Sequence, residues 1–416
     1  MFLYKYINLL TDNLLGFTNL MGWNYGKPAL ILLIPAGLSF YIFKSITYLI
    51  ETGRGNIINI KFVNAALYIS YFPAIMAGPI DKPNNLINQF DRKVSFDYER
   101  VTDSLKIILW GFFSKVVIAD RLSPVTSRIF SDLNSYNGIY MVIGVLLFTV
   151  QIYCDFSGYS YIAYGFSKFI GIDVINNFKR PYLSKSIAEF WKRWHISLSK
   201  WLQEYIFLPL SYSIARILME RKINIRIDYA SYIIASLITM IVCGLWHGAN
   251  ITFAIWGLYF GILLVLSLLF KKTRRALKSK FHINNANPFI SLSKIMFTFL
   301  LVSISWIFFK SDTLKEIGQI FSNIFSWSGI INNSNGSGII KNILKTYGLS
   351  YKELYLSIVF IAVLLTVDIL QERFNIFERI KKQNKLIRWS LYYALLISVI
   401  FFGAYNSQQG FIYQQF

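Results

Sequence analysis

The histidine in the stretch CGLWHGAN, at residues 243–250, is the side chain best placed for acid–base chemistry. Imidazole changes its charge closest to neutral pH, so it can both take and give a proton there. His247 ends one apolar run, residues 230–247, and a second run begins at residue 251. Ionisable groups at membrane depth are costly and are functional candidates by default. The alternative is a histidine at a helix end that a turn satisfies, and the sequence favours the two equally.

A second histidine, His195, lies in the stretch AEFWKRWHISLSKWL at residues 188–202. It falls at the edge of a tryptophan-rich helical face, from which its ring can point into the protein. The helical pattern alone favours an ordinary role, in which the imidazole is hydrogen-bonded to a backbone carbonyl. The third histidine, His282, lies in the polar segment KFHINNANPF and is predicted to be a surface residue.

Two further groups lie beside the apolar runs. Asp155, in YCDFSGYS, would either cap a helix or form an ion pair, or else orient an imidazole or bind a polar substrate. Cys243 precedes His247 by one helical turn, so a Cys–His dyad is conceivable, although packing between helices is the ordinary role of such a cysteine. With two cysteines in the chain, neither a disulfide framework nor a metal cluster is indicated. The motifs of the common soluble enzymes, such as a Walker A loop or a GxSxG turn, are absent from the sequence.

The elements that carry these residues are membrane spans. The chain is 55% hydrophobic and 15% charged, and it contains long apolar runs. Runs near the length that crosses a bilayer are residues 28–50, 230–247, 251–270, 289–309, 354–370 and 391–404. Weaker candidates are residues 64–80, 105–119, 140–153 and 159–172. We therefore predict an all-α polytopic integral membrane protein that forms a single transmembrane domain over residues 1–416.

The net charge of +21 is unevenly distributed. Basic residues gather in segments 179–226, 271–280 and 373–388, which the positive-inside rule assigns to the cytoplasm. Two spans separate each segment from the next, so the loop INNSNGSG (331–338) and the C-terminal tail are expected outside. Because the basic blocks are short and lie next to spans, they do not indicate nucleic-acid binding. The first twenty residues lack the features of a cleavable signal peptide.

The central tryptophan-rich stretch has the pattern of an amphipathic helix. Ser186 and Glu189 form a capping-box pattern that predicts a start near Ile187. Arg193 and Lys200 fall on the polar face. The residues of the apolar face are Trp191, Trp194, Leu198, Trp201 and Tyr205. Such a helix is typical of the membrane–water boundary, and we predict that it lies along the cytoplasmic interface.

Five motifs and the closing FIYQQF follow one another in the order found in the membrane-bound O-acyltransferases, a family that the chain resembles. The resemblance spans roughly residues 35–265 plus the C-terminus, and it is strongest to the alginate O-acetyltransferase branch. The family histidine of the WHG motif maps to His247, and that of the RWH motif maps to His195. The motifs are YFPAIMAGPI (71–80), GFFSKVVIADRL (111–122), QIYCDFSGYSYIAYGFSKFIGI (151–172), NFKRPYLSKSIAEFWKRWHISLSKWL (177–202) and GLWHGANITFAIWG (244–257), with the earlier segment 37–50.

The resemblance implies a fold, a location and partners. The family fold is a ring of tilted transmembrane helices around a central tunnel, here with interfacial helices. By this resemblance, the protein is expected to move an acyl group from a cytoplasmic donor to an acceptor outside the cytoplasmic membrane, as bacterial members of the family do. An SGNH-type extracytoplasmic partner then places the group on a polysaccharide. Members of this branch carry further N-terminal spans before the segment that resembles residues 37–50, so those spans are expected to be missing or shortened in this chain.

The resemblance also assigns roles to the candidate residues. We expect acetyl-coenzyme A as the donor, His247 as the general base and His195 as the residue that polarises or positions the donor, and no metal is required. Arg180, Lys192 and Arg193 could attract the anionic donor, although such side chains bind the headgroups of membrane lipids equally readily. The full set of expected substrate- and donor-binding residues is Asp155, Arg180, Trp191, Arg193, Trp246 and Asn250. Two alternatives are a D-alanyl transferase for teichoic acids and a polysaccharide or lipid transporter without chemistry.

Overall fold

A computed structural model describes residues 21, 37–58, 60–76, 78–222, 225–282, 287–326, 347–348 and 350–405. Within these ranges all the regular elements are helices, as predicted. In the described part, six helices are long and apolar enough to cross a membrane. They are α7 (Ile139–Phe169), α11 (Ile227–His247), α12 (Ile251–Leu269), α14 (Pro288–Lys310), α17 (Tyr351–Phe374) and α19 (Lys385–Phe402). Five of the strong candidate spans are thereby confirmed, each to within a few residues.

The weaker candidate spans were assigned less accurately. Residues 140–153 and 159–169 belong to one helix, α7, which runs through the polar segment around Asp155 without a break and ends three residues before the predicted span does. Residues 64–80 do not form one span, because α3 (Phe62–Ser70) ends before Pro73 and gives way to η1 (Phe72–Ala74) and α4 (Pro83–Phe90). Residues 105–119 begin in α5 (Tyr98–Phe112) and continue as the π-helix η2 (Phe113–Ala119), which leads into α6 (Asp120–Ser131).

The first strong candidate, residues 28–50, is described only in part. Residues 28–36 lie outside the described ranges, and the rest of the run forms α2 (Leu38–Gly53). The remaining elements are η3 (Leu133–Ser135), α13 (Lys271–Lys280), α15 (Leu314–Phe325) and α18 (Ile376–Lys381).

The predicted continuous helix from Ile187 to Tyr205 is wrong. Ser186 does cap its start, since its Oγ accepts the Glu189 N–H at 3.2 Å. However, the first segment ends at Trp191 and the chain turns at His195. The central stretch consists of η4 (Pro181–Leu183), α8 (Ile187–Trp191), α9 (Ile196–Leu202), η5 (Gln203–Phe207) and α10 (Leu208–Glu220).

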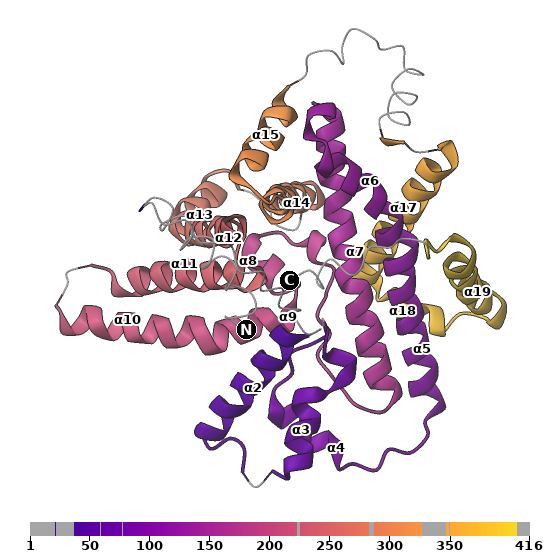
Figure 1. Ribbon diagram of the computed structural model, residues 1–416, viewed down its shortest axis with the longest axis horizontal. Coiled ribbons are helices and arrows are strands. Elements are labelled where there is room, and N and C mark those ends of the chain that lie inside the picture. The colour runs from indigo at the N-terminus through magenta and orange to yellow at the C-terminus, as the bar shows by residue number, and fades with distance from the viewer. Residues whose placement is uncertain are drawn as a thin grey trace.

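The short helices α8 and α9 lie in the middle of the helix array, with the longer helices around them (Figure 1). α10 and α11 form an antiparallel pair that extends away from this centre. α11 then pairs closely with α12. A Cβ on Gly244 would lie 2.1 Å from the carbonyl oxygen of Phe253, and one on Gly257 would lie 2.1 Å from that of Met240. The glycines therefore let the two backbones meet, which fixes the position of the turn that carries His247.

The core around α8 and α9 is aromatic. Trp194 is 1% exposed, and its ring centroid lies 5.0 Å from that of Trp306 on α14 and 5.1 Å from that of Phe178. Lys200 is exposed, as the amphipathic pattern predicted. Arg193 is not, because its side chain is 15% exposed and lies in an ion pair. Large buried rings contribute most of the apolar area of such a core, so they hold the broken central stretch in place.

Candidate functional site

His247 is the last residue of α11 and is 2% exposed. Its ring lies in an aromatic pocket. The ring centroids are 4.6 Å from Trp246, 5.2 Å from Trp256 on α12 and 5.2 Å from Phe309 on α14. The next residue, Gly248, leaves room for the ring of Phe253, since a Cβ there would lie 2.6 Å from Phe253 Cε2. The imidazole is thus held by three helices in a position from which bulk water is excluded.

His195 forms the break between α8 and α9. Its backbone is in the left-handed region, with φ 42° and ψ 57°, which a non-glycine residue adopts only when its surroundings impose it. The surroundings are the segment at Asn177, whose carbonyl oxygen accepts the Ile196 N–H at 3.0 Å and whose Oδ1 accepts the Ser197 N–H at 3.1 Å. Ser197 Oγ in turn accepts the Ile80 N–H at 3.0 Å. The turn at His195 is therefore fixed by residues far from it in the sequence.

The His195 ring is 1% exposed and stands edge-on to Phe156 of α7 at 4.7 Å between centroids. This burial lowers the pKa of His195 to about 3. An imidazole with such a pKa is neutral at physiological pH, so it acts there as a neutral hydrogen-bonding group.

Trp246 connects the two histidines. Its ring centroid is 4.6 Å from that of His247 and 6.4 Å from that of His195. Phe40 of α2 lies 6.1 Å from Trp246 and 6.5 Å from His195. The structure therefore brings the two predicted histidines to one indole ring, although they are 52 positions apart in the sequence (247 − 195). We refer to His195, Trp246 and His247 as the histidine cluster.

Trp191 and Asn250 support this cluster. The ring of Trp191 lies 5.9 Å from that of Trp256, which itself contacts His247. Asn250 caps α12, where its Oδ1 accepts the Thr252 N–H at 3.2 Å, and its Nδ2 donates to the carbonyl oxygen of Asp312. Asn250 therefore holds the turn after His247 against the end of α14.

Arg180 and Arg193 lie together at one carboxylate. Arg180 Nε donates to Glu372 Oε2 at 2.7 Å, and Arg193 Nη2 donates to Glu372 Oε1 at 2.9 Å and to Glu189 at 2.7 Å. Sequence reasoning missed Glu372, which carries no motif. Both guanidinium groups are thus partly neutralised, and the exposed cations nearby are Lys179, Lys185 and Lys192.

Asp155 forms an ion pair, which was one of the two structural alternatives that the sequence left open for it. Its Oδ1 lies 2.5 Å from Lys115 Nζ of η2, and that ammonium is also 2.7 Å from Asp120 of α6. Asp155 and Asp120 are buried, 3% and 8% exposed. Sequence reasoning missed Lys115, although a lysine inside the apolar run 105–119 was a signal that pointed to it.

A model of the membrane-bound O-acyltransferase family matches residues 42–307, nearly two thirds of the chain. This chain belongs to that family. Together with the six candidate spans, membership makes it a multi-pass membrane protein. The histidine cluster, Trp191, Arg180 and Arg193 all lie within the matched region, whereas α15, α17 and α19 follow it.

Curated relatives include three kinds of enzyme. The chain is 35% identical to the probable alginate O-acetylase of Pseudomonas putida, over 78% of this chain and 62% of the relative. It is 31% identical to the peptidoglycan O-acetyltransferase of Helicobacter pylori, over 77% and 62%. It is 27% identical to the teichoic acid D-alanyltransferase of Bacillus subtilis, over 66% and 68%. The matches thus extend over about three fifths of the length of the two O-acetyl relatives.

Proposed function

We propose that the chain is an O-acetyltransferase that takes acetyl groups from acetyl-coenzyme A in the cytoplasm and delivers them across the membrane for O-acetylation of a secreted or cell-wall polysaccharide. The proposal depends mainly on one observation. Two buried histidines, His195 and His247, both lie next to the ring of Trp246, within the region that matches the family. Membership of an acyltransferase family favours chemistry over transport alone.

His247 acts as the general base in this proposal. It takes the proton of an acceptor hydroxyl as the hydroxyl oxygen attacks the thioester carbonyl. The resulting tetrahedral intermediate collapses with cleavage of the carbon–sulfur bond, and the imidazolium returns the proton to the departing thiolate. An ester and a free thiol result, so atoms and charge balance, and no metal is needed. The aromatic walls keep water, a competing nucleophile, away from the thioester.

His195, neutral in its buried position, positions the donor or polarises its carbonyl. The phosphates of coenzyme A suit the basic surface formed by Lys179, Lys185 and Lys192, since Arg180 and Arg193 already share Glu372. We assign that surface to the cytoplasmic side by the positive-inside rule.

The proposed location is the cytoplasmic membrane of a bacterium, with one domain over residues 1–416. The proposed partner is an extracytoplasmic SGNH-type acetyltransferase that passes the group to the glycan. In its support, relatives that carry O-acetyl names are named for alginate and for peptidoglycan, both of which lie outside the cytoplasm.

The donor can be tested with the purified protein in lipid vesicles. Acetyl-coenzyme A labelled in the acetyl group is supplied together with the SGNH-type partner and an acceptor glycan, and the label transferred to either of them is counted. In a parallel sample, a carrier protein charged with D-alanine replaces it, because relatives named teichoic acid D-alanyltransferases also match the chain. Transfer of acetyl but not D-alanyl supports the proposal, and transfer of D-alanyl alone would replace it.

A further inference from the structure

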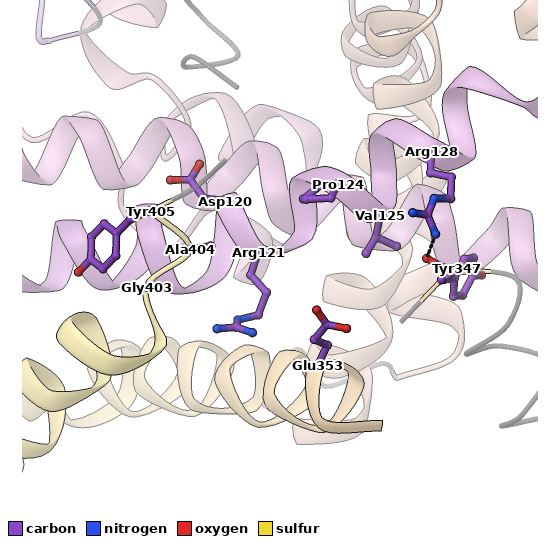
Figure 2. Close-up of a pocket in the computed structure, with 11 residues that line it drawn as sticks. Asp120, Arg121, Pro124, Val125, Arg128, Tyr347, Glu353, Gly403, Ala404 and Tyr405 are labelled. Atoms are coloured by element: carbon purple, nitrogen blue, oxygen red, sulfur yellow. Dashed lines mark hydrogen bonds between the residues drawn. The ribbon is translucent and has the colours of Figure 1, made fainter. Parts of the chain in front are cut away.

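A pocket of about 440 Å³ lies apart from the histidine cluster and shares no lining residue with it. Its walls come from α6, from the start of α17 and from the segment that follows α19 (Figure 2). The volume is within the range of sites for small molecules. The lining residues that bear on its chemistry are Asp120, Arg121, Arg128, Tyr347, Glu353 and Tyr405.

The pocket lies where two candidate membrane spans end. α17 begins and α19 ends beside it, and Glu353 and Gly403, near those two ends, line it. The segment after α19 is held in place, because the N–H of Ala404 donates to the carbonyl oxygen of Val116 at 2.8 Å. The ends of spans lie at the level of the lipid headgroups, where tyrosine rings such as that of Tyr405 are common. Membrane lipids are therefore the molecules that meet this pocket at the highest concentration.

Two guanidinium groups of α6 carry the positive charge of the pocket. Arg121 donates to the carbonyl oxygens of Phe402 and Val117, at 2.5 Å and 3.3 Å, and Arg128 donates to that of Tyr347 at 2.8 Å. In the part of the chain that the structure describes, neither group forms an ion pair with a carboxylate, so each has further N–H donors for a ligand. The two arginines are seven positions apart (128 − 121), which places them on the same face of α6. Their long side chains can therefore reach one anionic group that lies between them.

The contact at Gly348 shows how closely Arg128 is held. A Cβ on Gly348 would lie 1.6 Å from Arg128 Nη1, and the glycine has φ +61°. Only glycine combines that conformation with the space that the guanidinium occupies. The position of Arg128 at the pocket is therefore built into the backbone.

Glu353 adds a negative charge opposite the arginines. In Figure 2 its side chain points from α17 toward α6. Its Oε2 accepts bonds from the N–H and the Oγ of Ser350, at 2.8 Å and 2.9 Å, and the described residues place no hydrogen bond on Oε1. The other carboxylate of the pocket wall, that of Asp120, is paired with Lys115 at 2.7 Å. A ligand therefore meets two guanidinium groups and one available carboxylate oxygen.

We propose that this pocket binds the headgroup of phosphatidylethanolamine. The phosphate lies between Arg121 and Arg128, since guanidinium groups pair with phosphate oxygens through parallel hydrogen bonds. The primary ammonium, joined to the phosphate through two carbons, donates to Oε1 of Glu353. A single zwitterionic headgroup thus supplies the anion and the cation that the charges of the pocket require.

Other common headgroups match these charges less well. Phosphatidylglycerol offers the phosphate but no cation, so it leaves the charge of Glu353 uncompensated. Phosphatidylcholine offers a cation without N–H donors, so Oε1 of Glu353 gains no hydrogen bond from it. Exposed apolar side chains of the two adjoining spans, Ile358 of α17 and Ile400 and Phe401 of α19, provide surface for the acyl chains.

This inference goes beyond the proposed function and does not depend on it. It requires only that α17 and α19 cross the membrane and end beside the pocket. In the predicted orientation, the bound lipid belongs to the outer leaflet of the cytoplasmic membrane. Loss of lipid binding would therefore leave the acetyl-transfer proposal untouched, and the absence of acetyl transfer would leave the lipid site untouched.

The test measures binding of a short-chain phosphatidylethanolamine to the full-length protein in detergent by calorimetric titration. The matched probe is phosphatidylcholine of the same chain length, which carries the same charges but no N–H on its cation. The wild-type protein should bind phosphatidylethanolamine about ten- to a hundredfold more tightly, the value of a charged hydrogen bond. Glu353→Gln should abolish this preference. It should also keep α17 capped, because glutamine serves in a capping box as glutamate does.

The arginines are tested with the same lipids. Arg121→Gln and Arg128→Gln should each weaken the binding of both lipids about tenfold or more, because both lipids carry the phosphate. Gly348→Ala should weaken it as well, since the methyl group displaces Arg128. Arg216→Gln, at an exposed arginine on α10, should leave the affinities unchanged. Inorganic phosphate, titrated alone, should bind far more weakly than the lipid.

Thermal unfolding of each variant is recorded, and the comparison of lipids on the wild-type protein does not depend on the folding of any variant. Phosphatidylcholine or phosphatidylglycerol that binds the wild-type protein as tightly as phosphatidylethanolamine would overturn the assignment. So would a preference that persists in Glu353→Gln, or wild-type affinity in both Arg→Gln variants. Inorganic phosphate that binds as tightly as the lipid would make the pocket a site for a free anion and would reject the lipid.

Discussion

At the scale of single residues, the proposed roles of His247 and His282 lead to opposite expectations. His247→Ala should lower acetyl transfer about a hundred- to ten-thousandfold, the usual contribution of a general base. His282→Ala should have no effect, because His282 is exposed in a loop remote from the core. Transfer is measured per folded protein in membranes, since loss of a packed ring also affects stability.

His247→Gln separates the chemical role from packing. Glutamine preserves hydrogen bonding and much of the volume, but it is a far weaker base. A wild-type transfer rate in this variant would assign His247 a structural role, and His195 would then be the next candidate for the base.

His195 should make the fold sensitive to acid. Its pKa is about 3 in the folded protein and about 6.5 in an unfolded chain, so the unfolded state binds the proton first as pH falls. The free energy of unfolding therefore does not depend on this titration well above pH 6.5. It decreases as pH falls below 6.5, by about 2 kcal/mol between pH 7 and pH 5. His195→Asn, which tolerates the left-handed backbone, should show a smaller fall in Tm between these pH values. An equal fall in both proteins would contradict the burial of a neutral ring.

Sequence patterns identified both histidines and Trp246, but they did not show that the three rings lie side by side in the fold. Motif order led to the residues, whereas the contact depends on how α9 and α11 pack. The partners of Asp155 and of the two arginines were missed for the same reason. Lys115 is 40 residues from Asp155, and Glu372 is 179 residues from Arg193. Ion pairs between distant segments leave no periodicity in the sequence.

At the scale of elements, the tryptophan face should account for much of the stability of the central stretch. Trp194 is 1% exposed among aromatic rings, so Trp194→Ala should cost about 3–5 kcal/mol of unfolding free energy. Lys200→Ala should cost little, because Lys200 is exposed. Thermal unfolding in detergent compares the two. Similar Tm values for both variants would show that the face is not packed as described.

The same stretch shows where periodicity misleads. Spacings of three and four continue from Trp191 through Trp201, and they predict one helix. The structure keeps the buried face but breaks the helix at His195, because hydrogen bonds from Asn177 stabilise a left-handed turn there. A pattern of apolar residues records which side is buried, not whether the backbone between them is continuous.

At the scale of the whole molecule, hydropathy predicted the spans that are long and apolar and failed where polar groups are paired inside the protein. The polar segment around Asp155 divided α7 into two predicted spans, yet its ion pair with Lys115 lets one helix of 31 residues pass. The ammonium group of Lys115 offsets the free-energy cost of burying the carboxylate of Asp155, a cost that hydropathy counts as if the carboxylate were alone.

The orientation of the molecule gives the last prediction. The basic segment 179–226 should face the cytoplasm, and the opposite ends of the spans should face outside. The predicted outer loop 331–338 lies outside the described residues, so Ser135 of η3 is the better probe. It is exposed, and η3 lies beside α15 through the bond from Asn323 Nδ2 to the carbonyl oxygen of Leu133, at 2.6 Å.

An impermeant thiol reagent applied to intact cells should label Ser135→Cys and should label the exposed position Ser213→Cys only after the membrane is opened. The native cysteines, Cys154 and Cys243, are both 0% exposed and should stay unlabelled, which provides the background control. Labelling of Ser213→Cys from outside would reverse the orientation. It would also place the exposed lysines around Arg180 on the side that lacks coenzyme A, and the proposed direction of acetyl transfer would have to be abandoned.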